Sequence, residues 1–149
     1  RVLEAMLFAS AEPTALKAFL VANKAEGRAT LEVFLEYFRI DAAAIRADVI
    51  VGENQHAIKT VEGNPDAVAY VSIGTAAYEA ANGTPIRLLR MNGIEPTNAR
   101  VADGSFPVAR PLNLVTKGAP TGLAKEFLDY ALSDKVHDLV EKHLFIAVE

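Results

Sequence analysis

The chain alternates between short apolar runs and longer stretches in which apolar residues recur every three or four positions. The second pattern is that of a helix with one buried face, and short apolar runs that end at glycine or a polar residue are typical of buried strands. The predicted helices are Ala29–Arg39, Asn54–Val61, Gly74–Ala81, Pro120–Leu132 and Asp134–His143. The predicted strands are Ala47–Gly52, Ala67–Ser72, Ile86–Met91 and Pro111–Thr116.

Three further segments have weaker patterns. Val2–Ala9 is rich in alanine and leucine, which predicts a short helix. Lys17–Ala22 is consistent with a buried strand or a helix, and we favour a strand because a glycine-marked turn and a clear helix follow. Phe145–Val148 is expected to be a strand or an extended tail. In the helix over 120–132, we expect Leu123 and Phe127, together with Ala131, to face inward.

Strands that alternate with helices at this spacing predict an α/β fold with crossover connections. We therefore expect three layers, with a mostly parallel sheet and helices on both of its faces. A length of 149 residues suits one domain, 1–149, better than two. The loop-rich stretch Gly83–Ser105 is the expected position of a hinge or subdomain edge.

Composition narrows the classes of function. Hydrophobic residues make up 51% of the chain and charged residues 23%, which is ordinary for a globular domain. The net charge of −4 and the lack of a Lys/Arg run argue against binding to nucleic acid. No segment approaches the ~20 apolar residues of a membrane helix. The sequence opens at Arg1 without a charged-then-apolar leader, so we expect that a signal, if the protein is exported, was removed or was never part of these residues.

No catalytic or metal-binding pattern stands out. The sequence lacks cysteine, which excludes disulfides, thiolate ligands and cysteine nucleophiles. It has no G-x-S-x-G, Walker or dinucleotide-binding motif. His137 and His143 are six residues apart, which does not place them on one helix face as a metal pair. We predict that the chain is not an enzyme and has neither cofactor nor metal.

Four motifs in the second half occur in a specific order. They are Asn64–Ser72, Gly93–Thr97, Ser105–Leu112 and Ala124–Ser133. Together they resemble the phosphate-binding proteins of bacterial ABC importers, over residues 26–149, whereas residues 1–25 have no assigned ancestry. The resemblance implies a periplasmic-binding-protein-like lobe that binds inorganic phosphate for an ABC permease. It also implies a periplasmic or secreted location.

In that family the anion lies at a helix N-terminus preceded by R-x-D-G-S-G-T, where free N–H groups and hydroxyls meet it. Here Lys24 replaces the arginine and Glu26 the aspartate. Arg28 replaces the serine and Ala29 a glycine, at a cost of about 1 kcal/mol if that glycine has a positive φ. The ligand-binding residues implied by the resemblance are Lys24, Glu26, Gly27, Arg28, Ala29 and Thr30. Thr30 is equally consistent with a helix cap, and Arg28 with a solvated face beside Glu32.

Other positions depart from the family pattern. Leu144 and Ala147 replace a glycine and a proline of the tail, which suggests a changed local backbone. Arg110 is interpreted as an ion-pair partner in the motif that joins the two lobes. The family's N-terminal lobe has no counterpart in these residues, which suggests an excised, rearranged or engineered derivative. The alternative function is therefore a ligand-free α/β scaffold, and the surface left by the missing lobe favours a homodimer.

Overall fold

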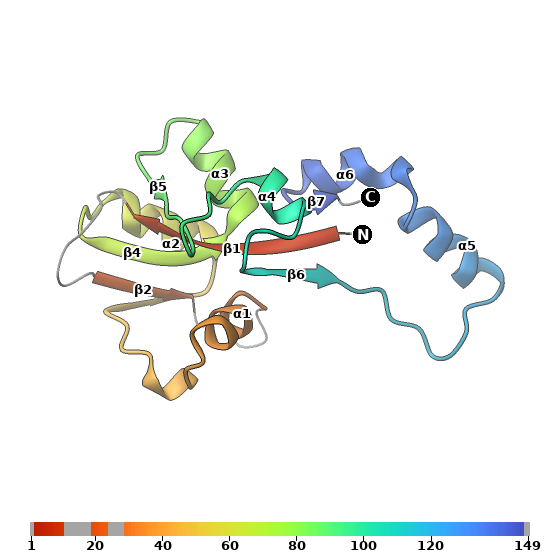
Figure 1. Cartoon of the computed structure of the whole chain (residues 1–149), viewed down its shortest axis with the longest axis horizontal. Coiled ribbons are helices and arrows are strands. Elements are labelled where there is room, and N and C mark those ends of the chain that lie inside the picture. The colour runs from red at the N-terminus through yellow and green to blue at the C-terminus, as the bar shows by residue number, and fades with distance from the viewer. Residues whose placement is uncertain (1, 11–18, 24–28, 148–149) are drawn as a thin grey trace.

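The computed structural model describes residues 2–10, 19–23 and 29–147 (Figure 1). Strands and helices alternate through most of this chain. The strands are β1 (Val2–Ser10), β2 (Phe19–Asn23), β3 (Val49–Val51), β4 (Ala67–Ser72), β5 (Arg87–Leu88), β6 (Ala109–Leu112) and β7 (Ile146–Ala147). The helices are α1 (Ala29–Phe38), α2 (Asn54–Glu62), α3 (Ile73–Ala81), α4 (Asn98–Ala102), α5 (Gly122–Ala131) and α6 (His137–Lys142). Short 3-10 turns lie at Ala42–Ala44 and Asp134–Val136.

The strands form one sheet in the order β3-β2-β4-β1-β5, with β6 and β7 also paired to β1. β2 runs parallel to β3 and β4, as the α/β pattern predicted. β1 is antiparallel to β4, β5, β6 and β7, so the sheet is mixed rather than mostly parallel. Among the strands of the described residues, only the pairings of β1 are antiparallel, whereas β3, β2 and β4 are parallel to one another.

The prediction of a helix over Val2–Ala9 is wrong, because this segment is strand β1. Alanine and leucine favour a helix locally, but strand propensity depends on the partners that a segment finds. The second half of β1 pairs with β4, from Met6 opposite Ser72 to Ser10 opposite Val68. Its first half pairs with β6 and β7. These distant pairings override the local preference.

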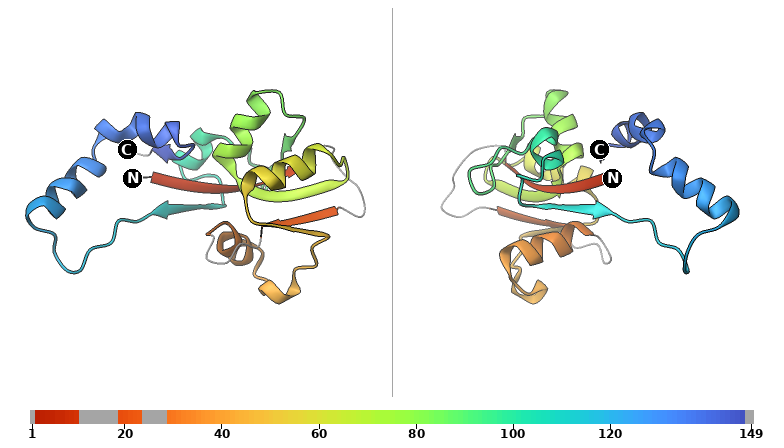
Figure 2. Two further views of the ribbon diagram at one scale, coloured as in Figure 1. Left: turned by 180° about the vertical axis from the view of Figure 1, so that it is seen from behind. Right: turned by 45° about the vertical axis from the view of Figure 1, so that its right-hand side comes forward.

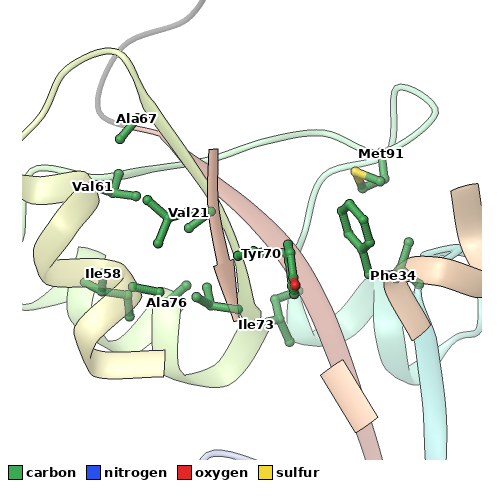
Figure 3. Close-up of a cluster of buried hydrophobic side chains, with 14 of the residues drawn as sticks. Val21, Phe34, Ile58, Val61, Ala67, Tyr70, Ile73, Ala76 and Met91 are labelled. Atoms are coloured by element: carbon green, nitrogen blue, oxygen red, sulfur yellow. The ribbon is translucent and has the colours of Figure 1, made fainter. Parts of the chain in front are cut away.

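Helices cover both faces of the sheet (Figure 1). On one face, the ring of Phe34 in α1 stacks on Tyr70 of β4, with ring centroids 4.3 Å apart (Figure 3). On the other face, α2 and α3 contribute buried side chains that include Ile58, Val61 and Ala76. Tyr70 and its strand neighbours Ala69 and Val71 are completely buried, and they belong to one cluster with the buried side chains of both faces. Within the described residues, no helix combines the length and apolarity needed to cross a bilayer.

The C-terminal third departs from the expected packing. Helix α4 lies in the stretch predicted to be loop-rich. β5 and β6 are shorter than predicted, whereas α5 occupies nearly the predicted range. α5 and the segment before it project from the rest of the molecule (Figure 2). The expectation that Leu123 and Phe127 face inward is wrong, because both are exposed.

Candidate functional site

The carboxyl ends of the three parallel strands lie at one edge of the sheet. Asn23, the last residue of β2, is opposite Val51, the last residue of β3. β4 runs in the same direction and ends at Ser72. Helices α1, α2 and α3 each begin just after one of these strand ends. Open α/β sheets bind ligands at this edge, where helix N-termini present free N–H groups and a positive dipole end.

Two buried hydroxyl-bearing residues lie at this edge, on the α1 side of the sheet. Thr30 comes one turn before Phe34 on the same face of α1, and Ser72 comes two residues after Tyr70 on the same face of β4. The stacked rings of Phe34 and Tyr70 lie at the α1–β4 interface. Thr30 and Ser72 are therefore placed at the same interface, closer to the carboxyl edge. Thr30 is 7% exposed and Ser72 is 9% exposed. Both hydroxyls are therefore largely withdrawn from water.

Neither of these two residues has the position and the hydrogen bond of a helix N-cap. Thr30 is the second residue of α1, whereas a capping residue precedes the first helical residue. Ser72 does precede α3, but its side chain makes no hydrogen bond to that helix. Sequence reasoning placed Ser72 in a family motif without assigning it a site role. The signal that could have identified it is its position at the end of a parallel strand directly before a helix.

Most of the predicted ligand loop lies outside the described residues. Lys24, Glu26, Gly27 and Arg28 belong to this part of the chain, and their roles stay predictions. Ala29 is the first residue of α1 and has a helical backbone, so the left-handed cost considered for that position does not apply. Among the described residues, the element that precedes α1 is strand β2.

Acidic side chains lie near the starts of α1 and α2. Glu53 is exposed, precedes α2 and makes no side-chain hydrogen bond to that helix. Glu32 lies in the first turn of α1. A carboxylate near an anion site repels a fully ionised oxyanion and can accept a hydrogen bond from a protonated one. The first turn of α3 is covered on one side by the backbone of Leu144.

Among the described side chains, no group of three or more His, Asp or Glu residues could hold a metal ion. Arg110 lies on β6, opposite Glu4 of β1 in the strand register. It lines a cavity of about 270 Å³ with residues of α1, away from the first turn of that helix. Arg110 therefore lies in the antiparallel pairing of β1 and β6 rather than at the carboxyl edge.

Comparison with known families identifies the lineage of the chain. The family model described as a PBP superfamily domain matches residues 11–135. A phosphate-binding protein PstS 2 of Streptococcus agalactiae is 26% identical over 139 residues, which cover 87% of this chain and 45% of that protein. The phosphate-binding protein PstS of Bacillus subtilis is 28% identical over 114 residues, which cover 76% of this chain and 36% of that protein. The chain thus spans less than half the length of these curated relatives.

Solved structures share the fold of this chain. A phosphate ABC transporter substrate-binding protein from Clostridium perfringens, determined with bound phosphate, superposes with a TM-score of 0.76 at 19% identity. The superposition covers 99% of this chain and 70% of that one. An ABC-type phosphate transport receptor from Vibrio cholerae gives a TM-score of 0.76 at 16% identity, over 98% of this chain and 70% of that one. The predicted α/β lobe of the periplasmic-binding-protein type is confirmed.

Proposed function

The chain belongs to the PBP superfamily, as a partial member related to PstS-like phosphate-binding proteins, and on this premise we propose that it binds inorganic phosphate. The anion lies at the carboxyl edge of the parallel strands, in front of α1. This family is one of non-enzymatic binding proteins, which agrees with the prediction that the chain is not an enzyme. The proposal extends to a location outside the cytoplasm and to delivery of phosphate to an ABC permease.

One observation carries the proposal: the first turn of α1 and two buried hydroxyl-bearing residues converge on one edge of the sheet. The amides of a first helical turn have no partners within the helix, and phosphate is well suited to them. Thr30 and Ser72 are placed to add hydroxyl donors to the same anion. Lys24 and Arg28, by resemblance, add charge-assisted contacts. Glu53 and Glu26 favour an anion that still carries a proton.

The alternative is a ligand-free scaffold of the same fold. It is supported by the loop that the resemblance implies, in which Arg28 replaces a serine and Ala29 a glycine. A clamp that closes over its ligand needs two lobes, and these 149 residues span less than half of the curated relatives. We therefore expect these residues by themselves to bind phosphate more weakly than a two-lobed protein does.

Thermal unfolding with increasing phosphate tests the proposal, with sulfate as the control anion. A ligand present at one hundred times its Kd stabilises a protein by about 2.7 kcal/mol, which is readily measured as a rise in Tm. Thr30→Val and Ser72→Ala are expected to reduce the phosphate-dependent rise. Thr60→Val is the matched control, because the Thr60 hydroxyl donates to the His56 carbonyl on α2. A Tm that does not respond to phosphate would leave the scaffold as the better description.

A further inference from the structure

Two asparagine–glycine pairs occur in the chain, at Asn82–Gly83 and Asn92–Gly93. Such a pair is prone to lose ammonia without an enzyme, because glycine carries no side chain that would shield its amide from the neighbouring asparagine. Both pairs are exposed, and a Cβ atom on either glycine would meet no atom within 4 Å. Exposure therefore does not distinguish the two pairs, and the difference between them lies in their hydrogen bonds.

The first pair is held at both of its reacting groups. Asn82 is the C-cap of α3, and its Nδ2 atom donates to the Tyr78 carbonyl at 2.7 Å. The amide of Gly83 donates to the Ala80 carbonyl at 3.2 Å. Deamidation requires the Asn82 side chain to turn and the Gly83 amide to attack it, so both bonds must break first. The end of α3 therefore protects this pair.

The second pair forms a two-residue turn in which both reacting groups are available. The φ angle is 51° at Asn92 and 78° at Gly93, as in a type I′ turn. The flanking residues Met91 and Ile94 exchange backbone hydrogen bonds of 3.1 and 2.9 Å. Among the described residues, neither the Gly93 amide nor Asn92 Nδ2 has a hydrogen-bond acceptor. The attacking nitrogen and the leaving nitrogen are thus both unhindered by such bonds.

A hydroxyl group lies at the carbonyl that the Gly93 nitrogen would attack. Tyr37 of α1 donates its phenolic hydrogen to Asn92 Oδ1 at 2.8 Å. Attack on the side-chain carbonyl places negative charge on this oxygen, and a donor at about 2.7–3.1 Å stabilises such charge. The Tyr37 hydroxyl is therefore in the position of an oxyanion donor for this reaction.

We propose that Asn92–Gly93 is a site of spontaneous deamidation, assisted by the Tyr37 hydroxyl. The Gly93 nitrogen loses its proton to water or hydroxide and bonds to Asn92 Cγ. The Cγ–Nδ2 bond then breaks, and ammonia leaves with a proton from water. Water opens the resulting succinimide ring at either of its two carbonyls, which leaves aspartate or isoaspartate at position 92. The net charge of −4 becomes more negative by one.

The two products differ in their effect on the fold. Aspartate keeps the backbone of the turn and can still accept the hydrogen bond from Tyr37. Isoaspartate adds a methylene group to the main chain, which does not fit a two-residue turn between Met91 and Ile94. Isoaspartate is therefore expected to release this turn from α1. The inference does not depend on phosphate binding.

Prolonged incubation at mildly alkaline pH, followed by peptide mapping, tests the inference. Each conversion raises the peptide mass by about 1 Da, and an isoaspartyl methyltransferase assay detects isoaspartate. In the folded protein we expect Asn92 to convert roughly tenfold faster than Asn82, because only Asn82 must first break two hydrogen bonds. The chain unfolded in guanidinium chloride is the reference, in which the two pairs should convert at similar rates. Equal rates in the folded protein, or faster conversion at Asn82, would overturn the inference.

Tyr37→Phe tests the role of the hydroxyl. This variant keeps the ring and removes the donor, so Asn92 is expected to convert roughly threefold to tenfold more slowly. Tyr78→Phe is the matched control, because Asn82 bonds to the backbone carbonyl of Tyr78 and not to its hydroxyl. The control should leave both rates unchanged, and circular dichroism checks that each variant is folded. Unchanged or faster conversion of Asn92 in folded Tyr37→Phe would overturn the assistance by Tyr37.

Discussion

Gly74, in the first turn of α3, lies directly against the backbone of Leu144 near the C-terminal strand. A Cβ atom on residue 74 would overlap the Leu144 carbonyl oxygen and crowd its carbonyl carbon. Gly74 is also buried, so the overlap cannot be relieved by movement into solvent. The close approach holds the C-terminal segment against α3.

Gly74→Ala is therefore expected to destabilise the fold by about 1–3 kcal/mol, the usual cost of overpacking. Urea unfolding followed by circular dichroism measures the change. Gly52→Ala is the matched control, because a Cβ atom at residue 52 would meet no atom within 4 Å. If both variants unfold at the same urea concentration, the close approach of α3 and Leu144 is not maintained in solution.

Arg39→Gly is expected to stabilise the protein by about 1 kcal/mol. Arg39 follows α1 with a left-handed φ of 53°, and the amide of Ile40 donates to the Leu35 carbonyl at 3.2 Å, as in a Schellman motif. Glycine adopts this conformation without the strain of a side chain. The Arg39 side chain is exposed, so little packing is lost. Arg39→Ala keeps a Cβ atom and should show no such gain in denaturant midpoint.

Phe34→Ala is expected to cost about 3–5 kcal/mol, the range for removing a buried aromatic ring. The variant loses the stacking contact with Tyr70 and leaves a cavity between α1 and the sheet. Phe38 lies one turn later with 42% of its surface exposed, so Phe38→Ala should cost clearly less. Chemical denaturation of both variants gives the comparison. Equal losses would contradict the described packing of α1.

The Glu79 carboxylate of α3 is hydrogen-bonded to α2 and to the loop after α3. These bonds should make the stability of the fold depend on pH. It accepts hydrogen bonds from Gln55 Nε2 at 2.9 Å and from Thr84 Oγ1 at 3.0 Å. These bonds, the Gln55 bond first, lower the pKa of Glu79 below its usual value of 4.5. A lowered folded-state pKa adds stability above the unfolded-state pKa, and this stability is lost as the pH falls through the folded-state pKa.

Glu79→Gln is thus expected to be less stable than the unmodified protein at pH 7. The difference should shrink as the pH falls from about 4.5, where the carboxylate becomes protonated in the unfolded state, through the lower folded-state pKa. Urea unfolding of both proteins from pH 7 to pH 3 measures this convergence. Glu126→Gln, on the exposed surface of α5, is a control for removing one negative charge. A constant difference across this range would show that the carboxylate does not hold these bonds.

The region from α1 to α3 was predicted closely because its signals are local. The apolar spacing of α1 and the apolar run of β4 are present in the sequence and need no knowledge of the partners. β1 was mistaken for a helix because its pairing with β4, β6 and β7 joins residues that are far apart in the chain. The outward position of Leu123 and Phe127 was missed for a related reason: an amphipathic helix does not reveal which surface covers it.

The candidate site was predicted in part. The apolar spacing predicted a helix over Ala29–Arg39, and α1 spans Ala29–Phe38 in the described part of the chain. Ser72 was not assigned to the site because its proximity to α1 follows from the stacking of Phe34 on Tyr70. Leu144 was expected to mark a changed backbone, yet its φ of 63° is the left-handed conformation that glycine favours. Leu144 thus adopts the backbone conformation expected of the glycine that it replaces by resemblance, and its side chain makes that conformation strained.

The central position of β1 has a consequence for how the protein reaches its native state. Its hydrogen-bonding partners come from four separate stretches, the last of them at Ile146–Ala147. Pairings this distant in sequence slow folding, because much chain entropy is lost before the contacts form. During synthesis, Val2 and Leu3 therefore lack their β7 partners until residues 146–147 have been made. Until its partner strands are available, β1 is an apolar segment that is vulnerable to aggregation and a target for chaperones.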